Sequence, residues 1–167
     1  LKFMNALAAR DTDLRRRFAR EWDVLRRMAP HPNVVGVHEV HDSGDEPFIV
    51  MEHVDGESLQ EACRKRGRLP AVDAARIARD VARGLAAIHT HGILHRDIKP
   101  ANVMLAADLT ARIVDFGLAK DLQRSALTQP GQLLGTAHYM APEQWEDAPP
   151  SPGVDLFSLG ATLYHSL

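Results

Sequence analysis

One short segment, residues 95–102, concentrates side chains that can do chemistry. It reads His-Arg-Asp-Ile-Lys-Pro-Ala-Asn, which brings an imidazole, a guanidinium, a carboxylate, an ammonium and an amide close together. Burying so many polar groups is costly unless each one finds a partner. We call residues 95–102 the catalytic segment, and its composition predicts a catalytic site whose partners come from elsewhere in the chain.

The elements around the catalytic segment suit that role. A long helical pattern over residues 71–89 precedes it, with one apolar face formed by Ile77, Val81, Leu85 and Ile88. Short strands are expected at 103–105 and 111–114, and Asp-Phe-Gly follows at 115–117. A rigid helix, a polar loop and a strand can hold catalytic groups in place. The mostly non-periodic stretch 118–141 is long for a compact domain, and such loops are usually functional or mobile.

The first part of the chain predicts a small sheet and one helix. Residues 1–4 read as the tail of a strand, and a helix from about Asp13 should end before Pro30. Strands are expected at 34–41 and 48–54, and a short helix near Leu59. We therefore expect an α+β fold with a sheet-containing part (1–54), a mostly helical part (55–167) and a ligand cleft between them.

Composition places the chain among ordinary globular domains. It is 45% hydrophobic and 25% charged, with a net charge of -2. Without a basic excess, nucleic acid is not an expected partner. One cysteine rules out an internal disulfide. No apolar run reaches the length of a membrane span, so we expect no membrane contact within these residues and a cytoplasmic location for this domain.

Both ends of the sequence look cut. The chain starts at Leu1 without an initiator Met, and it ends inside a helical pattern. In that pattern Leu156, Leu159, Leu163 and Leu167 are expected to share one face. The sequence thus predicts a fragment of a longer protein that folds poorly and has little activity alone. A membrane anchor elsewhere in the parent chain stays open.

Three motifs in order resemble those of the protein kinases. They are the catalytic segment, Asp115-Phe116-Gly117 and Ala141-Pro142-Glu143, and together they are far more specific than any one alone. Ile98 stands where the family pattern has Leu. The resemblance implies a bilobal kinase fold, here with a partial N-lobe and a partial C-lobe. The Gly-rich loop that covers the ATP phosphates in the family would lie before Leu1.

The resemblance assigns roles in ATP-dependent phosphoryl transfer. It implies that Asp97 accepts or orients the proton of the substrate hydroxyl and that Lys99 neutralises the transferring phosphate. Asn102 and Asp115 would bind Mg²⁺, with Mn²⁺ as the alternative ion. Lys2 resembles the strand lysine that holds the α- and β-phosphates of ATP, and Glu21 resembles its helix partner.

The adenine pocket and the packing behind it are also implied by the resemblance. Met51 would be the gatekeeper, the backbone groups of Glu52 and Val54 would bind adenine, and Met104 would form the floor of the pocket. An apolar column would join the two lobes in the active state. Its members would be Leu25, Val37, His95 and Phe116.

Lys99 and the stretch Gly135 to Tyr139 resemble serine/threonine kinases rather than tyrosine kinases, so protein substrates with Ser or Thr are implied. Arg96 suggests control by phosphorylation of the activation segment, because a guanidinium can bind a phosphate with two hydrogen bonds. Autophosphorylation or dimerisation could place that phosphate. Ser125 and Thr128 are the candidate acceptor sites for that phosphate, and Thr136 would bridge Asp97 and Lys99. Asp155 would hydrogen-bond to the backbone of the catalytic segment. Glu143 would be buried, and its arginine partner would follow Leu167.

Two other functions compete with a serine/threonine kinase. A pseudokinase scaffold is disfavoured because the motif lysines, Asp97, Asn102 and Asp115 are all present. A small-molecule phosphotransferase of related fold would lack the long segment that ends in Ala-Pro-Glu. A zinc site at His89, His91 and His95 is disfavoured because no cysteine or acid completes a tetrahedral set. The high content of arginine and alanine resembles the composition of bacterial members of this family.

Overall fold

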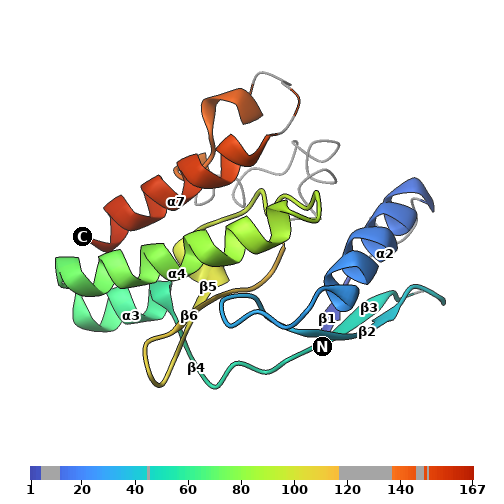
Figure 1. Cartoon of the computed structure of the whole chain (residues 1–167), viewed down its shortest axis with the longest axis horizontal. Coiled ribbons are helices and arrows are strands. Elements are labelled where there is room, and N and C mark those ends of the chain that lie inside the picture. Colours follow the sequence, from blue (N-terminus) through green and yellow to red (C-terminus); the bar gives the residue numbers. More distant parts are fainter. Residues whose placement is uncertain (5–11, 45, 117–136, 146–148, 150) are drawn as a thin grey trace.

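The computed structural model describes residues 1–4, 12–44, 46–116, 137–145, 149 and 151–167. Figure 1 shows the first helix and a small sheet on one side of the molecule, and the later helices with a second sheet on the other. The architecture is the predicted α+β mixture of a sheet-containing part and a mainly helical part. The division between residues 54 and 55 stays a prediction.

The first sheet carries the start of the chain. Strands β1 (Lys2–Phe3), β2 (Val37–His41) and β3 (Phe48–Met51) pair antiparallel in the order β1-β3-β2, with Lys2 opposite Ile49. Helix α2 (Thr12–Arg27) lies against this sheet and ends before Pro30, as predicted. Its Trp22 and Leu25 are buried, so one apolar face of the helix packs inward.

The second sheet includes the strand that directly follows the catalytic segment. Strands β4 (Gly56–Ser58), β5 (Val103–Ala106) and β6 (Ala111–Ile113) pair antiparallel in that order. The sequence predicted β5 and β6 but not β4, because Gly-Glu-Ser has low strand propensity. A side chain at Gly56 would place its Cβ 2.0 Å from the carbonyl oxygen of Leu105, so this pairing requires glycine.

Three helices complete the second part. Helix α3 (Leu59–Arg66) begins with a Ser58–Glu61 capping box, and α4 (Ala71–His89) has the predicted bounds and the predicted buried face. Helix α7 (Pro152–Ser166) packs along α4 (Figure 1). Two short 3₁₀ helices, η1 (Pro100–Asn102) and η2 (Pro142–Gln144), flank the site described below.

The predicted apolar face of α7 is wrong. Leu156 and Leu167 are exposed, whereas Leu159 and Leu163 are partly buried. The buried face is mostly polar, and its members are Val154, Asp155, Ser158, Thr162 and Ser166. Periodicity missed this face because the small hydroxyl groups of Ser158 and Ser166 bond to backbone carbonyls one turn back, which lets them be buried beside α4.

The two parts share backbone hydrogen bonds. The loop after α2 lies along β6, where Val35 N donates to Ile113 O at 3.0 Å and Ile113 N donates to Asn33 O at 2.9 Å. The side-chain amide of Asn33 also donates to Ala111 O. Buried residues of both parts consequently belong to one hydrophobic cluster. Among the described residues, no helix is long and apolar enough to cross a membrane.

Candidate active site

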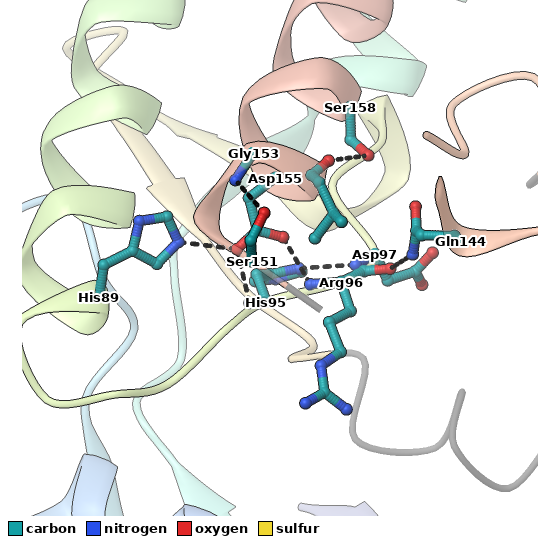
Figure 2. Close-up of polar contacts among 10 residues, drawn as sticks. His89, His95, Arg96, Asp97, Gln144, Ser151, Gly153, Asp155 and Ser158 are labelled. Atoms are coloured by element: carbon teal, nitrogen blue, oxygen red, sulfur yellow. Dashed lines mark hydrogen bonds and ion pairs between the residues drawn. The ribbon is translucent and has the colours of Figure 1, made fainter. Parts of the chain in front are cut away.

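Asp155 of α7 holds the backbone of the catalytic segment. Its carboxylate is fully buried and accepts from His95 N at 2.9 Å on Oδ2 and from Arg96 N at 2.6 Å on Oδ1 (Figure 2). The hydrogen bonds expected from Asp155 to this backbone are therefore present. Arg96 has φ +60, a conformation costly for a residue with a side chain. The two hydrogen bonds give this turn a fixed partner that offsets its strain.

His89 is a second partner of Asp155 that sequence reasoning missed. Its Nε2 lies 2.8 Å from Asp155 Oδ2, and its side chain is only 15% exposed (Figure 2). Since the carboxylate can only accept, Nε2 carries the proton and donates. His89 is the last residue of α4, so the helix end, the catalytic segment and α7 meet at a single carboxylate. In the sequence, His89 was considered only together with His91 and His95, as a disfavoured zinc site.

Asp97 lies between two other polar groups of the catalytic segment. Lys99 Nζ is 3.0 Å from Asp97 Oδ2, and Asn102 Nδ2 donates to the same oxygen at 2.9 Å and to the Asp97 carbonyl at 2.8 Å. Asn102 is 5% exposed. Because its amide nitrogen is used twice, its amide oxygen is directed away from Asp97. That oxygen is a suitable ligand for a hard cation.

Asp115 connects this cluster to the first sheet. Lys2 Nζ lies 3.1 Å from Asp115 Oδ1, so an ion pair joins β1 to the Asp-Phe-Gly motif. The preceding residue, Val114, donates its N–H to the carbonyl of Asn102 at 3.0 Å. Asp115 itself has φ +57, which marks a second strained functional position. Asn102 and Asp115 therefore lie on backbone segments that are hydrogen-bonded to each other. Their side-chain oxygens are ligands of the kind that divalent cations prefer.

An aromatic group packs behind Asp97. His95 is fully buried, with Nε2 2.9 Å from Val114 O and Nδ1 3.3 Å from Asp97 N. One nitrogen donates and the other accepts, so the ring is neutral, and burial lowers the pKa of His95 in agreement. Phe116 lies 5.0 Å from His95 and 5.4 Å from Trp22, ring centre to ring centre.

The arrangement of these residues agrees with a match to a known protein family. The sequence profile of the protein kinase domain matches residues 1–167. The chain belongs to the protein kinase domain family. The sheet-and-helix kinase fold predicted from the motifs is confirmed, and members of this family use ATP together with a divalent cation.

Several bacterial proteins resemble this kinase domain. It is 40% identical over 155 residues to "Probable serine/threonine-protein kinase PkwA" of Thermomonospora curvata, covering 93% of the chain and 21% of the relative. It is 36% identical over 167 residues to PknL of Mycobacterium bovis, covering 100% of the chain and 42% of the relative. PknB of Mycobacterium leprae is 36% identical over 172 residues, with 100% and 28% covered. The chain therefore spans less than half the length of these relatives.

In the kinase domain the residues predicted to surround adenine follow β3 and line β5. Met51 ends β3, Val54 follows three residues later, and Met104 lies in β5; all three are half-buried. Glu52 N donates to Gly36 O at 2.8 Å, so an adenine contact from Glu52 would have to use its carbonyl. The structure brings Met51 opposite Val37 in the sheet.

The side chain of Glu52 has partners that the sequence did not predict. One carboxylate oxygen accepts from Gly36 N at 3.2 Å, and the other forms an ion pair with Arg112 of β6. Burial alone would raise the pKa of Glu52, but the Gly36 N–H and the Arg112 guanidinium outweigh burial and lower it. Glu52 therefore ties the segment after β3 to both parts of the kinase domain.

Leu25 and Val37 lie in the same hydrophobic cluster as Phe116, Leu25 buried and Val37 partly buried. Glu21 is half-buried on α2, and its pairing with Lys2 stays a prediction, since the ion pair described for Lys2 is with Asp115.

The other predicted positions have mixed outcomes. Glu143 lies in η2 and is half-buried rather than fully buried, and its arginine partner stays a prediction. Its neighbour Gln144 does contact the catalytic segment, with Nε2 3.5 Å from Arg96 O (Figure 2). Ser125, Thr128 and Thr136 lie outside the described residues. The described part of the chain holds no group of three or more His, Cys, Asp or Glu arranged for a metal.

Proposed function

We propose that this kinase domain belongs to a serine/threonine protein kinase that transfers the γ-phosphoryl group of ATP to Ser or Thr hydroxyls of proteins. The observation that carries the proposal is the cluster of Asp97, Lys99 and Asn102, fixed on a buried Asp155. Phosphoryl transfer needs alignment and charge neutralisation more than covalent help. This cluster can supply both, and Asp155 of α7 fixes the backbone that carries it.

Each residue has a specific task in the proposed reaction. Asp97 orients the substrate hydroxyl and takes its proton, while Lys99, 3.0 Å from Asp97, neutralises the charge of the transferring phosphoryl group. Lys2 holds the α- and β-phosphates. Bound Mg²⁺, or Mn²⁺ in its place, would neutralise phosphate charge. The amide oxygen of Asn102 and the carboxylate of Asp115 would hold it.

The same proposal assigns the nucleotide pocket and the control of activity. Backbone groups of Glu52 and Val54 bind adenine between Met51 and Met104. His95 and Phe116 join Leu25 and Val37 in the apolar column of the active state, supported by the ring contacts of Phe116. Arg96 binds a phosphate on the activation segment, at Ser125 or Thr128. The kinase domain is proposed to act in the cytoplasm.

Serine and threonine are preferred to tyrosine as acceptors for two reasons. Lys99 lies beside Asp97, where it can neutralise the phosphate transferred to a short side chain. The bacterial relatives carry the printed name of serine/threonine-protein kinases. Protein substrates are therefore the expected partners, and the full-length protein itself is a further expected substrate.

Transfer of labelled phosphate from ATP to a Ser/Thr peptide library by the full-length protein tests the proposal. Asp97→Ala should abolish transfer, whereas Arg83→Gln, an exposed α4 change, should not alter it. A pseudokinase scaffold predicts that Asp97→Ala changes nothing because no transfer occurs. A small-molecule phosphotransferase predicts labelling of hydroxyl-bearing compounds and none of peptides.

A further inference from the structure

A basic depression lies away from the proposed active site, at the far end of α3 and α7. It is an open hollow of about 390 Å³ lined by Gln60, Cys63, Arg64, Gly67, Arg68 and His165. Figure 1 shows the end of α7 and helix α3 at the same end of α4. The hydrogen bond from Leu69 N to Ser166 O, at 2.8 Å, fixes the loop after α3 against α7. Two separate elements therefore form this surface.

Among the residues that the structure describes, the lining of the basic depression carries basic side chains and no acidic one. Four of the residues 64–68 are Arg or Lys in a chain whose net charge is -2. Lys65 and Arg66 are both paired with Glu57. Within the part of the chain that the structure describes, Arg64 and Arg68 form no ion pair, and no acidic side chain lines the hollow. Arg64 does interact electrostatically with Glu61 on α3, whose pKa is lowered by hydrogen bonds from Ser58 and, more weakly, by the charges of Lys65 and Arg64. Basic residues at a helix end are common, but Arg68 and His165 lie outside α3 and face the same hollow.

We propose that the basic depression binds a phosphorylated serine or threonine side chain of a protein segment. Two guanidinium groups in one hollow suit a phosphate, which carries close to two negative charges and accepts paired hydrogen bonds. The choice of phosphate rests on the proposed function, because the product of that reaction is a phosphorylated Ser or Thr. The protein would thus bind a segment that it, or a similar enzyme, has already phosphorylated.

The depression also adjoins the segment that precedes Ala141-Pro142-Glu143. The rings of His165 and Tyr139 lie 5.9 Å apart, and Ser158 Oγ donates to the Tyr139 carbonyl at 2.7 Å. A phosphate beside His165 should therefore restrain Tyr139. We expect slower amide hydrogen exchange across residues 137–141 when the depression is occupied.

Fluorescence anisotropy of the full-length protein without ATP tests the proposal. The probe is a labelled peptide with one phosphothreonine among neutral residues. We expect it to bind, and the Arg64→Gln/Arg68→Gln double variant to weaken binding about tenfold or more. Arg83→Gln, an exposed arginine of α4, should bind as the wild type does. Unchanged melting temperatures of both variants would show that they fold.

Equal binding by the double variant and the wild type would overturn the proposal. So would equal binding of the unphosphorylated peptide, or of a peptide with Glu in place of phosphothreonine. Inorganic phosphate that binds as tightly as the peptide, or anionic lipid vesicles that bind where the phosphopeptide does not, would also contradict it. A protein that binds the phosphopeptide but transfers no phosphate would overturn the proposed function and leave this site standing.

Discussion

Two carboxylates of the proposed active site lie in opposite surroundings. Asp155 is fully buried and accepts from His89, His95 and Arg96. Asp115 pairs with Lys2 at 3.1 Å, with side chains 50% and 30% exposed. A buried carboxylate with fixed donors is costly to disturb, whereas an exposed pair exchanges its partners easily. The first therefore stabilises the site, and the second is available to a nucleotide and a cation.

The largest expected effect comes from Asp155→Ala. It leaves the buried N–H of His95 and the partly buried N–H of Arg96 without acceptors, and each such loss costs about 1–3 kcal/mol. Denaturant unfolding of the full-length protein should show a loss of this size together with loss of activity. Asp155→Asn keeps one acceptor oxygen and should lose less. A stable but inactive Asp155→Ala protein would contradict the stabilising role.

His89→Ala should have the next largest effect. It removes one of three donors to Asp155, and a hydrogen bond to a charged group contributes about 1.5–3 kcal/mol. Denaturant unfolding measures the loss, and a lower kcat with an unchanged KM for ATP would show that Asp97 has moved. His89→Gln, which keeps a donor, should recover part of both. His91→Ala is the matched control, because His91 is exposed two residues later; equal effects of the two alanine variants would refute the assignment.

Lys2→Ala should separate function from stability. Its ion pair with Asp115 is partly exposed, and such pairs contribute about 1 kcal/mol or less. The free energy of unfolding should therefore change little, while the KM for ATP rises and transfer falls sharply. Arg26→Ala, which breaks the exposed pair with Asp23, should alter neither. If Lys2→Ala destabilised the protein as much as Asp155→Ala, the contrast between the two carboxylates would fail.

The sequence predicted the helices and strands better than it predicted which side chains contact each other. Helix α4 could be predicted to the residue because its apolar period is regular and Gly92, at φ +72, follows its end. The hydrogen bonds of Asp155 to the catalytic segment followed from the family motifs. Its bond to His89 did not, because the two residues are 66 positions apart and no local pattern relates them. Arg112 and Glu52 were missed for the same reason, being 60 positions apart.

The smallest expected effect concerns Glu52, whose partners lie in both parts of the kinase domain. Its folded pKa lies below the ordinary value of 4.5, so its stabilising contribution is fully present above about pH 4.5 and is lost as pH falls through the lower folded pKa. Because the side chain is 38% exposed, that contribution should be about 1 kcal/mol or less. Unfolding of the wild type and Glu52→Gln should therefore differ slightly at pH 7 and converge toward pH 3. A difference that grew as pH fell would mean that Arg112 does not hold Glu52 in its charged form.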